Sequence, residues 1–383
     1  AAAKHALRYA LPMMRKAATV HLVSIDEEGA PKSVPSAQQI ADYLMEVHCV
    51  SVQASGLRAA DSPPEQLAEF YAEVGADMLV MGAYSSGITN PLAQYFTRQQ
   101  RPFLVFTSSD DAITRPGSDW IFRINQPSYA YAQVLFDVFD AINAERGAGT
   151  LKTIVTVHGN GAFESAVADA VDLIASERGY TVLQRQDYDQ AGADFRPILN
   201  RFKTLNPDVL FMVSYAADSV ALMRQVQEVG LDAKVFAGGA AGFALPGFIE
   251  GSGPAADYVF TATMWTKDVP YPGAQDLNAR LSAILGRTPS YHAAQAYAAV
   301  ITAVDVLKRA ASFAPADVRA ALLATNMPDT VYGPIRFEDY QGYKNQAPLP
   351  AVAEQVVNGD FVTVYVNGQV VGDLLETPSW NAR

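Results

Sequence analysis

Hydroxyl side chains follow two of the strand-like runs in this chain and are well suited to hold an anion. Two short groups come after the apolar runs 78–82 and 103–106, respectively: Ser85 and Ser86, then Thr107, Ser108 and Ser109. Hydroxyl groups and the amides at a helix start donate hydrogen bonds, which are charge-assisted when the acceptor is a carboxylate. The alternative is that these residues are ordinary helix N-caps, where Ser and Thr are favoured.

Other kinds of chemistry lack the residues that they need. Cys49 is the only cysteine, so no intramolecular disulfide and no thiolate metal cluster can form. The histidines show neither HExxH nor i,i+4 spacing, which argues against a zinc site: His5, His21, His48, His158 and His292. No nucleophile elbow, glycine-rich phosphate loop or spaced carboxylate pair indicates catalysis. We therefore expect no enzyme, no metal, no nucleotide and no cofactor, and we interpret His292 as a satisfied residue at a helix start.

Composition limits the partners. The 383 residues suggest two lobes, and a hydrophobic share of 50% supports a substantial core. A formal charge of −12 argues against nucleic acid and against an anionic membrane. No apolar stretch approaches the roughly 18 residues of a membrane span, and the first residues lack the pattern of a secretion signal. A mature exported protein would also lack a secretion signal, so this absence does not establish a cytoplasmic location. A recombinant protein of this sequence would be cytoplasmic.

Strand-like runs alternate with helical patterns, which is typical of an α/β protein with parallel sheets. Strands are expected at Val20–Ile25, Cys49–Gln53, Met78–Gly82, Phe103–Phe106, Thr153–Val157, Thr181–Gln184, Val209–Val213, Lys234–Ala237 and Tyr258–Ala262. Helices are expected at Ser36–Val47, Pro64–Val74, Phe163–Arg178, Asp194–Leu205, Ala217–Val229 and Ala293–Ala311. The segments 351–358 and 361–366 alternate around Asn358-Gly-Asp and predict a hairpin.

From about Ser85 to Val366 the sequence resembles a type I periplasmic solute-binding protein of the branched-chain amino acid transporter family. The resemblance is clear in Tyr332-Gly-Pro-Ile-Arg-Phe-Glu-Asp339 and in Tyr291-His-Ala-Ala-Gln-Ala-Tyr297. It implies two lobes, each a parallel sheet flanked by helices in flavodoxin-like order, with three chain crossings between them. The expected lobes are residues 1–124 with 262–331, and residues 125–261 with 332–383. It further implies non-catalytic capture of a carboxylate-bearing solute between the lobes, by a periplasmic monomer that docks on an ABC permease.

The same resemblance extends the candidate site into the second lobe. It implies ligand contacts in the loops at 160–163, 215–218 and 239–241, and it favours ligand contact over simple capping for the hydroxyl groups. The residues that we single out in this lobe are Tyr129, Phe163, Tyr215, Asp218, Gly239 and Ala240, with Phe243 and Trp265 as further aromatic walls. The loop 238–243 carries no acidic residue to pair with a ligand ammonium, in contrast to the family pattern. Either Asp218 supplies that charge or it is an ordinary helix-start carboxylate.

Upstream, residues 6–84 resemble the second half of a universal stress protein domain, through the stretches 10–17, 20–26 and 75–84. Such a domain orders its strands 3-2-1-4-5, and its first strand is missing here. The strand at 20–25 would then lie between the strands at 49–53 and 78–82. Residues 3–16 would form an additional helix. The join at residues 84 and 85 favours an engineered chimera over a natural gene. The glycines of the ATP-binding motif are absent after Gly82. Three hypotheses remain open: a solute-binding protein, a hybrid without activity and a nucleotide-binding stress protein.

Overall fold

The computed structural model describes residues 20–26, 38, 45, 52–58, 79–189 and 194–383, and it divides the chain into two compact units. The first unit consists of Ala1–Ser108, Ala112–Asn125 and Leu277–Pro348. The second consists of Ser109–Asp111, Gln126–Asp276 and Leu349–Arg383.

The second unit is built on an eight-stranded sheet of order β17-β16-β15-β10-β9-β8-β6-β7. Its strands are β6 (Thr153–Gly159), β7 (Thr181–Tyr188), β8 (Val209–Val213), β9 (Val235–Gly238), β10 (Phe260–Thr263), β15 (Val352–Val357), β16 (Asp360–Val366) and β17 (Gln369–Val370). Strands β6 to β10 pair in parallel, and β15 to β17 add an antiparallel extension beside β10. In chain order the parallel part reads 2-1-3-4-5, which confirms the predicted flavodoxin-like order.

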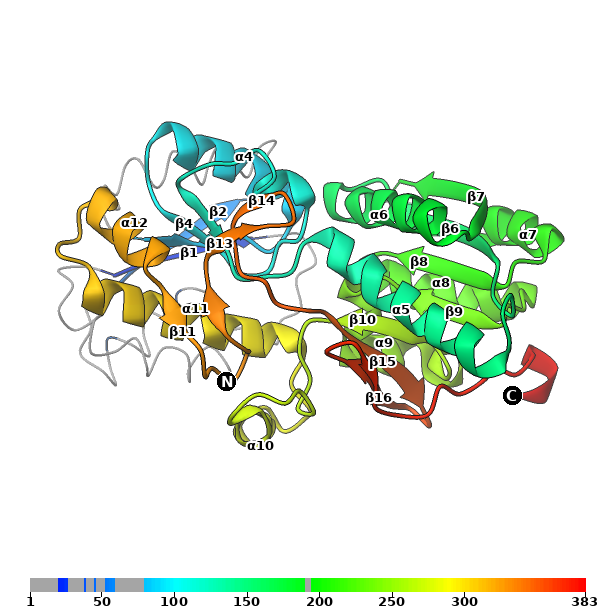
Figure 1. Ribbon diagram of the computed structural model, residues 1–383. Coiled ribbons are helices and arrows are strands. Elements are labelled where there is room, and N and C mark those ends of the chain that lie inside the picture. Colours follow the sequence, from blue (N-terminus) through cyan, green and yellow to red (C-terminus); the bar gives the residue numbers. More distant parts are fainter. Residues whose placement is uncertain (1–19, 27–37, 39–44, 46–51, 59–78, 190–193) are drawn as a thin grey trace. The chain divides into compact units, whose positions relative to one another are not determined.

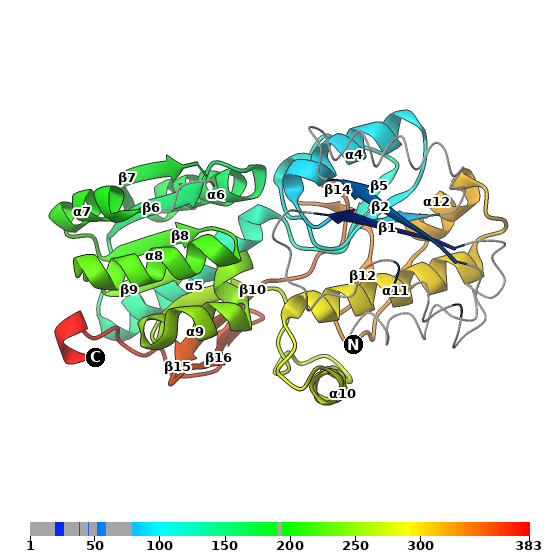
Figure 2. The same cartoon turned by 180° about the vertical axis from the view of Figure 1, so that it is seen from behind.

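Helices cover both faces of this sheet, as crossovers between parallel strands require. They are α5 (Ser128–Arg146), α6 (Ala162–Arg178), α7 (Arg196–Leu205), α8 (Ala216–Val229) and α9 (Pro246–Ser252). Figure 1 shows α5 in front of the sheet, and Figure 2 shows α8 and α9 over the opposite face. All five residues of β8 are buried, which explains why the sequence there is one continuous apolar run.

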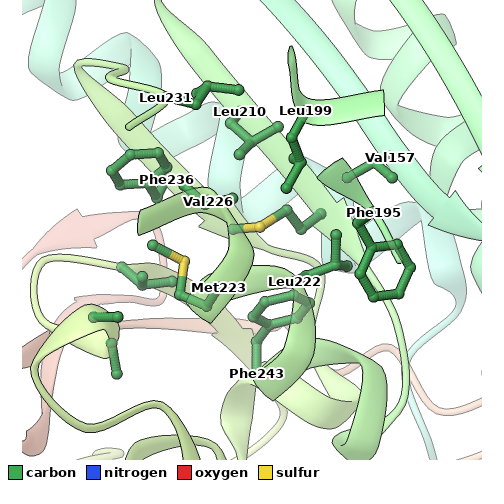
Figure 3. Packing of buried hydrophobic residues seen from close by; sticks show 14 of the residues in the cluster. Val157, Phe195, Leu199, Leu210, Leu222, Met223, Val226, Leu231, Phe236 and Phe243 are labelled. Atoms are coloured by element: carbon green, nitrogen blue, oxygen red, sulfur yellow. The ribbon is translucent and has the colours of Figure 1, made fainter. Parts of the chain in front are cut away.

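One core cluster of the second unit lies between its sheet and the helices α7 and α8 (Figure 3). Leu210 and Met212 of β8 and Phe236 of β9 pack against Leu222 and Val226 of α8, and all five side chains are fully buried. The apolar residues of α8 recur at a spacing of four, so one face of the helix meets the sheet. This packing fixes where α8 begins, and with it the loop that follows β8.

The first unit contains a five-stranded sheet of order β13-β14-β5-β4-β3. Its strands are β3 (Val80–Met81), β4 (Phe103–Val105), β5 (Ile121–Arg123), β13 (Glu338–Tyr340) and β14 (Tyr343–Gln346). Two smaller sheets pair β1 (Val20–Asp26) with β2 (Val52–Arg58) in parallel, and β11 (Asn326–Met327) with β12 (Ile335–Arg336). The helices are α4 (Ser86–Arg98), α11 (Tyr291–Arg309) and α12 (Pro315–Leu323), and α10 (Ala274–Leu285) begins at the border of the two units. Leu92 and Phe96 of α4 are buried against Phe103 and Val105 of β4.

Several boundaries differ from those expected. Apart from the three residues Ser109–Asp111, the chain passes between units after Asn125, Asp276 and Pro348, whereas the expected lobes end at residues 124, 261 and 331. The second crossing comes later because the loop after β10 stays on the second unit, where the Thr363 hydroxyl donates to the Asp268 carboxylate at 2.9 Å. The third comes later because Gln346 of β14 pairs with Arg123 of β5 in the first unit.

Only some of the elements predicted in the N-terminal part of the chain fall within the described residues. Within the described residues, β1 pairs with β2, as expected for neighbouring strands, whereas β3 pairs with β4 and is not joined to β1. The expected helices 3–16 and 64–74, and Cys49, lie outside the described residues. Of the expected helix 36–47 only positions 38 and 45 are described, and both are helical. No helix in the described part of the chain combines the length and apolarity that crossing a membrane requires.

Candidate functional site

The strand order of the second unit marks one edge of its sheet as a place for a ligand. The order reverses between β6 and β8, and ligands of open α/β sheets bind where the loops after such strands diverge. Phe163 in the first turn of α6 and Tyr215 before α8 come from these two loops. Their ring centroids lie 5.5 Å apart, and Phe163 is buried whereas Tyr215 is half-buried. The structure therefore brings these two predicted site residues together.

The loop after β9 packs closely against the start of α8. The amide of Gly242 donates to the carbonyl oxygen of Ser214 at 3.0 Å, and the amide of Gly239 donates to that of Met212 at 2.8 Å. Gly239 and Ala240 are buried, and Ala240 has a positive φ of 63°, a conformation that is uncommon for a residue other than glycine. These two predicted residues can therefore shape the backbone of the site more readily than they can offer a side chain.

Asp218 is the acidic member of the predicted set and lies in the first turn of α8. The Tyr188 hydroxyl at the end of β7 donates a hydrogen bond of 3.2 Å to its Oδ2 atom. Burial raises the pKa of Asp218, while the bond from Tyr188 opposes the rise. Burial also raises the pKa of the Tyr188 phenol, so the phenol stays protonated and acts as the donor. The carboxylate keeps lone pairs for a second partner, because one phenol donor uses only one of them.

In the first unit, hydroxyl groups fasten the loop between β3 and α4. The carbonyl oxygen of Ala83 accepts hydrogen bonds from Thr107 Oγ1 and Ser108 Oγ, both at 2.8 Å. Ser108 Oγ also lies 2.9 Å from the carbonyl oxygen of Tyr84 and 2.6 Å from Thr89 Oγ1. The hydroxyl protons of Thr107 and Ser108 thus serve the backbone of this loop, a role that spacing alone did not predict.

Ser85 differs from its neighbours. It is the N-cap residue of α4, yet its side chain makes no capping hydrogen bond. The alternative that the Ser85 hydroxyl is an ordinary helix cap is therefore wrong at this position. Its backbone carbonyl accepts from Thr89 Oγ1 at 2.9 Å, whereas its half-buried hydroxyl has no hydrogen bond within the described residues. Ser85 is therefore the predicted hydroxyl that is best placed to meet a ligand.

This contrast gives a stability prediction. We expect Ser108→Ala to lower the free energy of unfolding by about 1–2 kcal/mol, because it removes a buried hydroxyl whose one proton is shared between two backbone carbonyl oxygens. We expect the matched change Ser85→Ala to stay within about 0.5 kcal/mol of the wild type. Denaturant unfolding of both variants measures the difference, and equal losses would contradict the separate roles assigned to the two hydroxyl groups.

The remaining predicted residues take different places. Ser86 in α4 is buried, and the buried Ser109 belongs to the second unit, where its carbonyl oxygen accepts from the amide of Ser128 at 2.8 Å. Tyr129 is half-buried in the first turn of α5, where burial raises the pKa of its phenol. Trp265 is buried in the loop after β10. The part that these four residues play in the site stays a prediction.

Phe243 was a candidate wall of the site with a core position as the favoured alternative, and the structure places it in the core. It is fully buried in the core cluster and packs edge-to-face on Phe248 of α9 with centroids 5.1 Å apart. The reason is the tight turn before it, because Gly238 approaches the Phe243 ring so closely that a Cβ atom there would lie 2.4 Å from its Cγ atom. The aromatic side chain thereby fills the space beneath the loop.

Sequence reasoning missed two polar residues near these loops, and the structure revises its interpretation of a third. Tyr188 was missed because β7 was expected to end at residue 184, whereas its pairing with β6 continues to Gly159 and Tyr188. Glu164 is a buried carboxylate in the first turn of α6, and the sequence signal was its place directly after Phe163. His292 was interpreted as a satisfied residue, but only one of its two ring nitrogens has a hydrogen-bond partner within the described residues.

The described residues include no cluster of three or more His, Cys, Asp or Glu side chains arranged to bind a metal ion.

Comparisons with known proteins agree with this architecture. The model of a family described as periplasmic binding protein matches residues 65–359. Leu/Ile/Val-binding protein homolog 7 of Brucella melitensis is 23% identical over 307 residues, which cover 77% of this chain and 76% of that protein. The crystal structure of a leucine-binding protein from Thermotoga maritima superposes with a TM-score of 0.74 at 17% identity, over 90% of this chain and 97% of the other. A benzoate-bound solute-binding protein of an ABC transporter from R. palustris gives a TM-score of 0.71 at 17% identity, over 93% and 98% of the two chains.

Proposed function

Because the chain belongs to the periplasmic binding protein family, we propose that it is the solute-binding component of an ABC importer and captures its solute without chemical change. The match of the family model over residues 65–359 carries this proposal. The natural setting would be the periplasm, and the partner would be a membrane permease on which the protein docks as a monomer. That the loops of the two units face one another across a cleft stays a prediction.

We further propose that the solute is a small carboxylate with an apolar body. Support comes from the start of α4, where the Ser85 hydroxyl and the positive end of a 13-residue helix dipole both favour an anion. The aromatic pair Phe163 and Tyr215 offers an apolar contact in the second unit. The relative from Brucella is named for leucine, isoleucine and valine, and the structure from R. palustris holds benzoate, so both amino acids and plain carboxylic acids are reasonable probes.

A thermal unfolding experiment tests the proposal. A ligand present at about one hundred times its dissociation constant stabilises the folded state by about 2.7 kcal/mol. We would screen leucine, isoleucine, benzoate and ATP. A rise in Tm with any of the three carboxylates would support the proposal, whereas a cooperative transition that moves only with ATP would favour a nucleotide-binding protein instead.

Asp218→Asn distinguishes the two ligand classes. An amino acid carries an ammonium group, and a half-buried carboxylate is a suitable partner for it, whereas benzoate carries no cation. If the solute is an amino acid, we expect the variant to weaken leucine binding at least about tenfold, since each 1.4 kcal/mol of lost pairing is a factor of ten. Benzoate, which has no group to pair with Asp218, should bind the variant no more weakly than the wild type. Calorimetric titration measures both affinities, and an unchanged leucine affinity would remove Asp218 from the role of ammonium partner.

The hybrid origin of residues 6–84 stays a separate prediction. The family match begins at residue 65, inside the segment that resembles a universal stress protein. We therefore propose no second function on the basis of that resemblance.

A further inference from the structure

A chain of buried hydrogen bonds in the first unit ends at the ring of His292. Asn125 Nδ2 donates to the carbonyl oxygen of Thr107 at 2.6 Å, and Gln295 Nε2 donates to Asn125 Oδ1 at 2.6 Å. His292 Nδ1 lies 2.9 Å from Gln295 Oε1. Asn125 and Gln295 are both fully buried, so neither side chain can exchange these partners for water.

The direction of this chain is fixed at its far end. A backbone carbonyl oxygen can only accept, so Asn125 must present its amide nitrogen to Thr107 and keep its oxygen for Gln295. Gln295 must then donate to Asn125 and accept from His292, which places a proton on His292 Nδ1. Burial lowers the pKa of His292 to about 4, so the ring is neutral at pH 7. Its other nitrogen, Nε2, therefore carries a lone pair and no proton.

This lone pair has no protein partner. Nε2 of His292 is buried and accepts no hydrogen bond within the described part of the chain. The ring lies tilted against that of Tyr291, with centroids 4.0 Å apart, and meets the ring of Tyr84 edge-on at 5.2 Å. Tyr84 is 49% exposed and directly precedes Ser85, so the side chain that covers the histidine is itself at the surface, in the loop of the candidate site.

We infer that His292 Nε2 is an acceptor for the bound solute, selecting carboxylates that also carry a hydroxyl or amine hydrogen-bond donor. The inference rests on the proposed function, because it concerns the same loops. A buried acceptor without a partner costs free energy in the empty protein, and a donor on the ligand removes that cost. A ligand of the same shape that lacks the donor leaves Nε2 unsatisfied and binds less tightly.

The first test needs no ligand. Nitrogen-15 NMR of the histidine side chains distinguishes the two neutral tautomers and the charged ring, and His292→Phe assigns the resonances. At pH 7 and at pH 5.5 we expect a neutral ring that is protonated on Nδ1. A ring protonated on Nε2, or on both nitrogens, would overturn the inference, because Nε2 would then be a donor.

The second test compares matched ligands by calorimetry. The pairs are 3-hydroxybenzoate with benzoate, and leucine with 4-methylpentanoate, which lacks the amine. In at least one pair we expect the wild type to bind the donor-bearing member about tenfold more tightly, the effect of one buried hydrogen bond. His292→Phe, which keeps an aromatic ring beside Tyr84, should remove that preference, so that the two members of the pair bind the variant equally. His292→Gln, whose amide oxygen is an acceptor, should restore part of the preference.

The outcomes separate this inference from the proposed function. If the carboxylates bind but the two members of each pair bind equally, or if the preference survives in His292→Phe, the inference is wrong and the proposed function stands. If none of the four compounds binds a wild-type protein that unfolds cooperatively, the proposed ligand class is wrong, and the inference fails with it.

Discussion

We expect Gly242→Ala to lower the free energy of unfolding by about 3 kcal/mol, at the upper end for overpacked sites. A Cβ atom at position 242 would lie 2.5 Å from the carbonyl oxygen of Tyr215 and 2.6 Å from its carbonyl carbon. Both are backbone atoms at the start of α8, so they cannot rotate away as the end of a flexible side chain would. Relief requires the loop to move away from α8, which also lengthens the bond from the Gly242 amide to Ser214. Guanidinium unfolding followed by circular dichroism measures the loss.

Gly247→Ala is the matched control for this prediction. A Cβ atom there meets nothing within 4 Å, and the residue lies in α9, so alanine should leave stability unchanged or raise it by up to about 1 kcal/mol. The loop movement in Gly242→Ala should also weaken the binding of any carboxylate that the wild type binds, since Tyr215 shifts with it. Equal stability of the two variants would contradict the close approach of this loop to α8.

Much of the fold is predictable because burial on both faces of a sheet leaves a simple pattern. The five apolar residues of β8 were predicted with the correct bounds, because a parallel strand covered on both faces is a continuous apolar run. The hairpin of β15 and β16 was predicted from Asn358 and Gly359, which adopt φ values of 51° and 77° in the turn. Strand β14 was missed because its residues Tyr343–Gln346 are mostly polar, and its place is set by pairing with β5.

The candidate site was predictable at the level of loops but not of atoms. The spacing of Thr107 and Ser108 after a strand identifies a loop at the sheet edge, but it cannot tell whether a hydroxyl faces a ligand or a carbonyl oxygen of the next loop. The protonation of His292 depends on Gln295 and, through it, on Asn125, which is 170 positions away in the sequence. No local pattern contains that relation, because it arises only when β5 and α11 pack in the same unit.

The second large effect concerns a carboxylate in the sheet of the second unit. Glu354 on β15 is half-buried between Thr261 of β10 and Thr363 of β16, its neighbours in the strand register. Thr363 donates to the nearby Asp268 carboxylate at 2.9 Å, and Lys267 forms an ion pair with the same group at 2.8 Å. Burial raises the pKa of Glu354 to about 8, and the charge of Asp268 adds to the rise while Lys267 opposes it.

We expect Glu354→Gln to be more stable than the wild type at pH 9 by about 4–5 kcal/mol, and equally stable near pH 4. The unfolded chain releases the Glu354 proton near its ordinary pKa of about 4.5, whereas the folded protein holds it up to about pH 8. Between these values the folded state binds more protons, so the stability of the wild type falls as the pH rises. Glutamine resembles the protonated glutamate side chain, so the variant lacks this dependence of stability on pH.

Asp360→Asn, an equal charge change at an exposed position of β16, is the control for net charge. Denaturant unfolding at several pH values measures the free energy of unfolding of each protein. If both variants showed the same dependence on pH as the wild type, the prediction would be wrong, because Glu354 would then be ionised in the folded protein at no cost.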